Sequence, residues 1–248
     1  MTDSQRLART AGVYYLVVAI FGGFAHAVRT QVYVPGDATA TTDNVVANAD
    51  LVRFSFAADL VQATFAVFLV MALYRLLRHV HPSMARAMVI FVVLQVGITC
   101  LNLVHQFGAL MVATQPSYAN GFGDEGANTL VLLLMDLQHN GYLVAQIFFG
   151  LWLFPLGLLA YRSGMFPRAL GVILMVATGA YLTDAALQFL AYDVADAVSG
   201  PVLIPVVIVA EVSMLLYLLI KGVRTPATNS NPPNTTQPAD RSLVGASS

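Results

Sequence analysis

The sequence predicts an all-α membrane protein: a compact bundle of six transmembrane helices with both termini in the cytoplasm. The chain is 58% hydrophobic and 10% charged, with a mean hydropathy of +0.72, whereas an ordinary soluble domain has about 25% charged residues. Long apolar stretches recur along it, and most reach the roughly 20 residues that a helix needs to cross a bilayer. Because the alternating pattern of a β-barrel is absent, helices are the structure that satisfies the backbone in lipid.

The six predicted spans follow the apolar stretches in chain order, as a single transmembrane domain over 11–224. They are 11–28, 53–77, 87–113, 129–161, 166–190 and 201–221. The connections "RHVHPSMAR" and "YRSGMFPR" are short, so neighbouring helices run antiparallel. The fourth stretch is too long for one straight crossing. It either projects beyond the membrane or breaks near Gly141 or Pro155, because proline removes a helix hydrogen bond.

Three polar segments flank or separate the spans. Residues 1–10 are predicted to be a cytoplasmic N-terminus, and 225–248, rich in Pro, Asn, Ser and Thr, a disordered cytoplasmic tail. The longest external loop, 29–52, contains the turn signal "PGD" at 35–37. Thr42 or Asp43 is expected to cap a short helix that leads into span two.

The basic residues divide unequally between the two sides of the predicted bundle. Ten lie on the side of the termini and two on the other side, and this asymmetry predicts cytoplasmic termini in a cytoplasmic (inner) membrane. The ten are Arg6, Arg9, Arg75, Arg78, Arg86, Arg162, Arg168, Lys221, Arg224 and Arg241, and the two are Arg29 and Arg53. An alternative is a signal peptide cleaved near Ala25-His26-Ala27. Cys100 is the single cysteine, which excludes an internal disulfide. Because basic patches are missing, a nucleic-acid partner is not expected.

Ionisable side chains recur at one depth of the predicted bundle. At 1.5 Å per residue they lie roughly 9–16 Å from the outer ends of their spans. Each carboxylate in lipid costs about 2.5–3.5 kcal/mol on insertion scales. We therefore expect these groups to line one polar chamber that is open to the outside. The ionisable members are Asp59, His105, Asp136, His139, Asp184 and Glu211.

Helical periodicity indicates which side chains face this chamber. Asp136, His139 and Asn140 share a stripe with Gln146, whereas Gln138 points away. Tyr14, Tyr15, Trp152 and Tyr161 are assigned to interfacial aromatic belts. The candidate ligand-binding residues are Arg53, Asp59, Asn102, His105, Asp136, His139, Asp184 and Glu211. For the amides alone, helix–helix hydrogen bonding is the simpler interpretation.

Three functional classes fit these residues. The first is a protein that binds or transports a small ligand, a cation or protons, with the lipid bilayer as its surroundings. The second is an intramembrane, metal-dependent hydrolase in which His105, Asp136 and His139 hold a divalent metal and a second carboxylate activates water. The third is an accessory or signalling subunit. Both histidines also fit a purely structural role.

Three blocks of sequence resemble a known bacterial membrane family. They are "VPGDATATTDNVVANADLVRFSFAADLVQ", "MDLQHNGYLVAQIFFGLWLFPLG" and "YRSGMFPRALGVILM" followed by "GAYLTD". Together they resemble the family of domain of unknown function 4386, from about Arg9 to Gly222. The resemblance implies an integral membrane protein that keeps its first helix, and it implies no activity. His139 lies one position away from the Asp-Leu-His order of that block. The matching positions are Pro35, Gly36, Asp37, Arg53, Asp59, Asp136, Gly141, Tyr142, Arg162, Gly164, Pro167 and Asp184.

Overall fold

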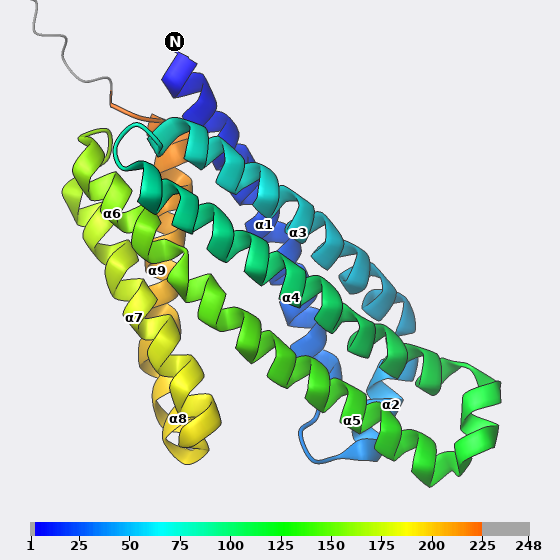
Figure 1. Cartoon of the computed structure of the whole chain (residues 1–248). Coiled ribbons are helices and arrows are strands. Elements are labelled where there is room, and N and C mark those ends of the chain that lie inside the picture. Colours follow the sequence, from blue (N-terminus) through cyan, green and yellow to red (C-terminus); the bar gives the residue numbers. More distant parts are fainter. Residues whose placement is uncertain (1–2, 225–248) are drawn as a thin grey trace, which may run out of the picture.

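The computed structural model describes residues 3–224, and every regular element within them is a helix (Figure 1). The elements are α1 (Asp3–Val32), α2 (Ala38–Ala47), α3 (Ala49–Leu77), α4 (Pro82–Thr114), α5 (Pro116–Leu151), α6 (Leu153–Ser163), α7 (Arg168–Leu190), α8 (Tyr192–Val198), η1 (Ser199–Leu203), α9 (Ile204–Leu216) and η2 (Tyr217–Lys221). Here η denotes a π-helical turn. Within these residues, six helical segments are long and apolar enough to cross a membrane: Asp3–Val32, Ala49–Leu77, Pro82–Thr114, Asn120–Ser163, Arg168–Leu190 and Ser199–Lys221. The predicted all-α, six-span class is therefore confirmed, whereas the predicted tail at 225–248 lies outside the described residues.

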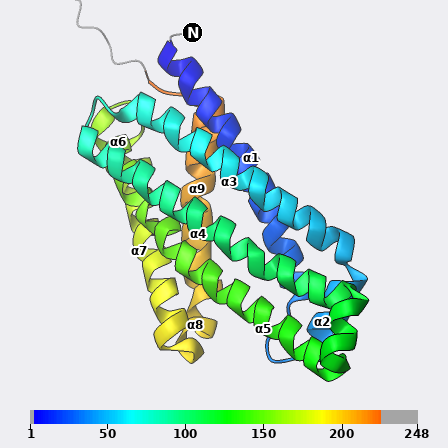
Figure 2. The same cartoon turned by 45° about the vertical axis from the view of Figure 1, so that its right-hand side comes forward.

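Both described ends of the chain lie at one end of the bundle, which we call the basic end (Figures 1 and 2). There the backbone N–H of Arg224 donates to the carbonyl of Met165 at 3.0 Å. The described basic residues of this end are Arg6, Arg9, Arg75, Arg78, Arg86, Arg162, Arg168, Lys221 and Arg224. We call the opposite end, which carries α2 and α8, the acidic end. That the basic end faces the cytoplasm stays a prediction.

The first helix extends further than the predicted span. α1 continues to Val32, so Arg29 lies inside the helix and is buried, although the sequence predicted it in a loop. The prediction was wrong because no helix-breaking residue follows until Pro35-Gly36. α1 also runs without a break through residues 25–27 and packs along α3. Cleavage there remains an untested alternative.

The predicted turn at 35–37 is present, but the residue that caps α2 differs from the prediction. Gly36 has φ +77°, which glycine adopts without strain. The Asp37 carboxylate then accepts the Ala40 N–H at 2.9 Å, as N-cap aspartates do. Thr42 and Asp43 instead lie inside α2. The cap follows directly on the turn, because that is where the first helical N–H groups lack partners.

The long fourth span breaks near Pro155 and runs straight through Gly141. α5 ends at Leu151, α6 begins at Leu153, and Trp152 lies at the junction. The proline has no N–H to donate to the carbonyl four residues earlier, which accounts for the interruption. The same span also begins earlier than predicted: α5 is kinked at Gly123, where the backbone is non-helical with φ +70°, and the helix that continues from this kink starts before residue 129.

Two buried apolar clusters hold the bundle together. One lies toward the basic end and includes Leu73, Met88 and Leu156. The other lies toward the acidic end and includes Val32 and Val131. Along α3, α4 and α5, the buried polar side chains fall between the stretches that supply these clusters, whereas Arg29 on α1 lies within the stretch of the second cluster. The predicted polar band is thus enclosed by apolar packing on both sides.

Candidate functional site

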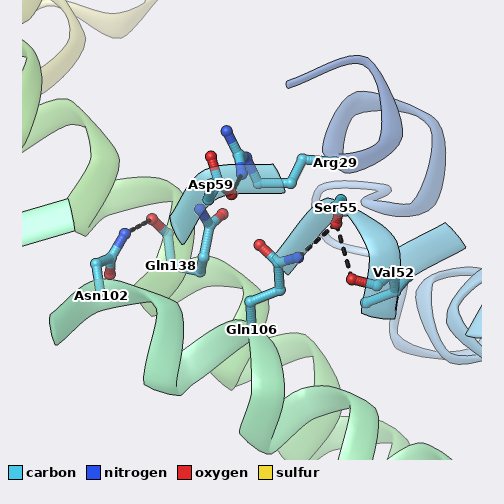
Figure 3. A network of polar contacts seen from close by, with 7 residues as sticks. All are labelled: Arg29, Val52, Ser55, Asp59, Asn102, Gln106 and Gln138. Carbon is cyan, nitrogen blue, oxygen red and sulfur yellow. Dashed lines mark hydrogen bonds and ion pairs between the residues drawn. The ribbon is translucent and has the colours of Figure 1, made fainter. Parts of the chain in front are cut away.

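Two buried charged side chains form an ion pair between α1 and α3. Arg29 Nη1 donates to Asp59 Oδ2, and the Asp59 residue is 1% exposed (Figure 3). The Arg29 guanidinium carbon also lies 5.4 Å from the centroid of the Tyr142 ring on α5, within cation–π range. One arginine therefore joins three helices.

Amide side chains connect α4 with its neighbours beside this pair (Figure 3). Asn102 Nδ2 donates to the carbonyl oxygen of Gln138 at 2.7 Å, and Asn102 Oδ1 lies 3.1 Å from His105 Nδ1. Gln106 Nε2 donates to the Ser55 hydroxyl at 2.8 Å. Because α5 packs along α4 for most of its length, Gln138 is buried in this network. The prediction that Gln138 points away from the buried polar groups was wrong.

Glu211 on α9 is held by two tyrosines. The Tyr15 hydroxyl donates to Oε2 at 3.0 Å, and the Tyr181 hydroxyl donates to Oε1 at 2.7 Å. Tyr15 and Trp152 are buried, so their assignment to an interfacial belt was wrong. Among residues 3–224, the ion pairs are Arg29–Asp59 and Arg53–Asp50. Glu211 thus has hydrogen-bond donors but no cationic partner in the described chain.

Asp184 on α7 is held in a similar way by neutral donors. Gln146 Nε2 donates to Asp184 Oδ2, and the Ser199 hydroxyl donates to Oδ1. These contacts tie α7 to α5 and to the turn η1. Asp184 is also buried and is not part of an ion pair within residues 3–224.

Asp184 and Glu211 line the same pocket. Its volume is about 400 Å³, and it lies among α1, α5, α7, η1 and α9. Its polar lining residues are His26, Tyr142, Gln146, Tyr181, Asp184 and Glu211. The remaining lining residues are Ala19, Gly22, Gly23, Ala180, Leu203, Ile204, Val207, Ile208 and Val212. Two carboxyl groups therefore share a mostly apolar pocket that contains no lysine or arginine. We call it the outer pocket.

A second, smaller cavity borders Glu211 on the side of the basic end. It has about 40 Å³, and its lining includes Val92, Gln95 and Trp152. The Gln95 Oε1 atom is buried and has no hydrogen-bond partner among the described residues. A cavity of this size is large enough for a water molecule. Glu211 therefore lies between the outer pocket and this cavity, which we call the inner cavity.

Asp136 and His139 do not line the outer pocket. The Tyr33 hydroxyl donates to Asp136 Oδ1 at 2.6 Å, and the Tyr33 ring centroid lies 5.5 Å from that of His139. Burial raises the pKa of Tyr33, and the hydrogen bond to Asp136 raises it further. The tyrosine therefore stays protonated and keeps donating to this carboxylate at neutral pH.

The structure thus divides the predicted ligand-binding residues into separate groups. Asp184 and Glu211 line the outer pocket. Asp59 is linked to it indirectly, because Asp59 pairs with Arg29 and Arg29 contacts Tyr142, which lines the pocket. Asn102 and His105 belong to the α4–α5 contact, whereas Asp136 and His139 lie beside Tyr33. Arg53 is exposed and pairs with Asp50 at 2.7 Å.

The sequence prediction missed four residues that hold the carboxylates: Arg29, Tyr15, Tyr33 and Ser199. A signal for Arg29 was present. It follows His26 by one helical turn and precedes the first helix breaker, so it extends the polar face of span one.

The three predicted metal ligands do not form a ready ligand set. Asp136 is bonded to Tyr33, His105 to Asn102, and the His139 side chain is exposed. Within residues 3–224, no group of three or more His, Cys, Asp or Glu side chains lies close enough together to hold a metal ion.

Comparisons with known proteins find a family match over most of the chain. The model of the family described as domain of unknown function (DUF4386) matches residues 10–222. An uncharacterized protein of Archaeoglobus fulgidus is 29% identical over 163 residues, which is 65% of this chain and 79% of the relative. No solved structure matches the chain.

Proposed function

The chain belongs to the family of domain of unknown function 4386, which brings no assigned activity, and from the geometry of the outer pocket we propose that it binds a small organic cation within the membrane. The observation that carries this proposal is the presence of Asp184 and Glu211 in one pocket whose lining includes no lysine or arginine. A carboxylate removed from water is costly unless it is paired. A bound cation would supply the missing partner.

The size and the lining of the outer pocket favour an organic cation over a metal ion. A volume of about 400 Å³ lies within the range of roughly 300–1,000 Å³ that is typical of small-molecule sites. The phenol ring of Tyr181 lines the pocket and favours an ammonium group through cation–π attraction, whereas the Tyr142 ring already contacts the Arg29 guanidinium. The apolar residues that surround them suit the hydrocarbon part of the ligand.

The position of Glu211 supports transport of the bound cation. It borders both the outer pocket and the inner cavity, where Gln95 Oε1 has no partner among the described residues. A carboxyl group that meets both spaces is placed to exchange a cation for a proton, which it would take from or release to water in the outer pocket. We place the outer pocket on the external side of a cytoplasmic membrane, because the positive-inside rule puts the basic end in the cytoplasm.

Substitution of Glu211 tests the proposal directly. Trp152 is the single tryptophan of the chain, lines the inner cavity with Glu211 and lies 6.0 Å, ring centroid to ring centroid, from Tyr15. Its fluorescence in the purified full chain would report a titration with tetraethylammonium. Glu211→Gln keeps the shape of the side chain but removes the charge, and we expect it to weaken binding about tenfold or more, which corresponds to at least about 1.4 kcal/mol.

Asp43→Asn provides the matched control, because Asp43 is an exposed acid of the acidic end. It should leave the titration unchanged. Equal binding by the wild type and the Glu211→Gln variant, or no binding by the wild type, would overturn the proposal. Uptake of the same cation into proteoliposomes would then separate transport from binding alone.

A further inference from the structure

Two helices form the walls of the outer pocket, and two others form its floor. The walls are stripes of residues at helical spacing on α1 and α9, whereas α5 and α7 supply the polar floor. The wall residues of α1 are Ala19, Gly22, Gly23 and His26, and those of α9 are Ile204, Val207, Ile208, Glu211 and Val212. The α1 stripe runs from residue 19 to residue 26, seven steps along the helix, so the pocket extends for roughly 10 Å along the helices.

The two walls meet at the basic end and separate toward the acidic end. At the basic end, a Cβ built on Gly12 would lie 2.8 Å from the backbone nitrogen of Leu219 in η2, the turn that continues α9, so α1 touches the end of that span there. Figures 1 and 2 both show α1 and α9 diverging from this contact. The outer pocket therefore lies in a wedge between two membrane-spanning helices.

The described chain leaves the wedge uncovered on its lateral side. Ile204, Ile208 and Val212 line the pocket and are still 48%, 53% and 42% exposed. Across from them, Gly23 is exposed, and a Cβ added to it would meet no atom within 4 Å. Apolar side chains exposed along a membrane span face lipid tails. The opening between α1 and α9 thus faces the hydrocarbon region of the bilayer.

We propose that the ligand is an amphipathic amine that enters the outer pocket sideways from the bilayer. The ammonium group would lie between Glu211 and Asp184, and its hydrocarbon chain would pass between Gly23 and Ile208 into the lipid. This inference rests on the proposed function and adds the ligand class and the route of entry. A cation without a chain would have to reach the same carboxyl groups from water.

Chain length provides the test. The full chain in lipid nanodiscs would be titrated with butyltrimethylammonium and octyltrimethylammonium, with Trp152 fluorescence as the readout and discs without protein as the blank. Each added methylene favours the apolar phase. Entry from lipid therefore predicts that the apparent Kd of the octyl compound, calculated from its concentration in water, is at least about tenfold lower than that of the butyl compound. 1-Octanol, which has the chain but no charge, should not compete with the octyl compound.

A substitution in the wedge provides a second measurement. Gly23→Leu places a side chain in the lateral opening and should weaken binding of the octyl compound at least about fivefold. The matched control is Gly179→Leu on α7, because Gly179 is also exposed and has free space around it but does not line the pocket. Thermal unfolding of both variants would show that each is folded.

The outcomes separate this inference from the proposed function. Equal affinity for the butyl and octyl compounds would overturn lateral entry and leave cation binding in place. Competition by 1-octanol would show that the wedge binds an acyl chain without the charge and would overturn the amine assignment. Failure to bind either ammonium compound would overturn both proposals.

Discussion

Replacing Arg29 by alanine is expected to lower the free energy of unfolding by about 3–5 kcal/mol, because it leaves the buried Asp59 carboxylate without its partner. Asp59 is 1% exposed, so water cannot take the place of the guanidinium. The same change removes the cation that lies over Tyr142. Unfolding of the purified protein in mild detergent, followed by circular dichroism, would measure the loss.

Two controls show whether burial is the cause. Arg53→Ala breaks the exposed pair with Asp50, and we expect it to cost no more than about 1 kcal/mol. The double variant Arg29→Met with Asp59→Leu should be more stable than Arg29→Ala alone, because apolar residues often replace a buried ion pair at little cost. If Arg29→Ala and Arg53→Ala had equal effects, the buried pair would not be a main support of the bundle.

The parts of this fold that sequence predicts are those imposed by lipid. The six spans, the break near Pro155 and a band of polar side chains at one depth all follow from hydropathy and helix geometry. Each of these depends on the position of a residue along its own helix. None requires knowledge of which helices are neighbours.

The grouping of polar residues could not be predicted, because it depends on the order and rotation of the helices. Asp136 and Glu211 lie at similar predicted depths, yet Tyr33 bonds to the first while Tyr15 and Tyr181 bond to the second. Tyr15 and Tyr33 lie near the ends of their predicted span, where tyrosines are usually interfacial, so the sequence gives no sign that these two hold carboxylates. In place of the predicted single chamber, the structure has one pocket lined by Asp184 and Glu211, and separate groups of polar side chains outside it.

The structural role of Gly141 becomes clear only from the packing of its helix against a neighbour. In the sequence it was a candidate helix break, but α5 continues through it. Its importance is instead the close approach of α4, since a Cβ at Gly141 would lie 2.1 Å from Asn102 Oδ1. Small residues commonly allow such contacts between membrane helices.

Replacing Gly141 by alanine should therefore destabilise the protein by about 1–3 kcal/mol, the usual cost of overpacking. Asn102 cannot simply rotate away, because its amide nitrogen donates to the Gln138 carbonyl and its oxygen contacts His105. Asn102→Ala alone should cost only about 0.6 kcal/mol, the average for a hydrogen bond between membrane helices. The same unfolding measurement in detergent applies to both variants.

Combining the two substitutions distinguishes steric overlap from a general loss of stability. Asn102→Ala makes room for the new methyl group, so the double variant should be more stable than the sum of the single costs predicts, by about 0.5–3 kcal/mol. Gly179→Ala, where the added methyl group meets nothing within 4 Å, should not be destabilised. Additive effects would mean that α4 and α5 accommodate the methyl group without contact.

Because Tyr142 follows Gly141 and lines the outer pocket, separation of α4 and α5 should also weaken tetraethylammonium binding in the Gly141→Ala variant. Adding Asn102→Ala to that variant should restore the binding.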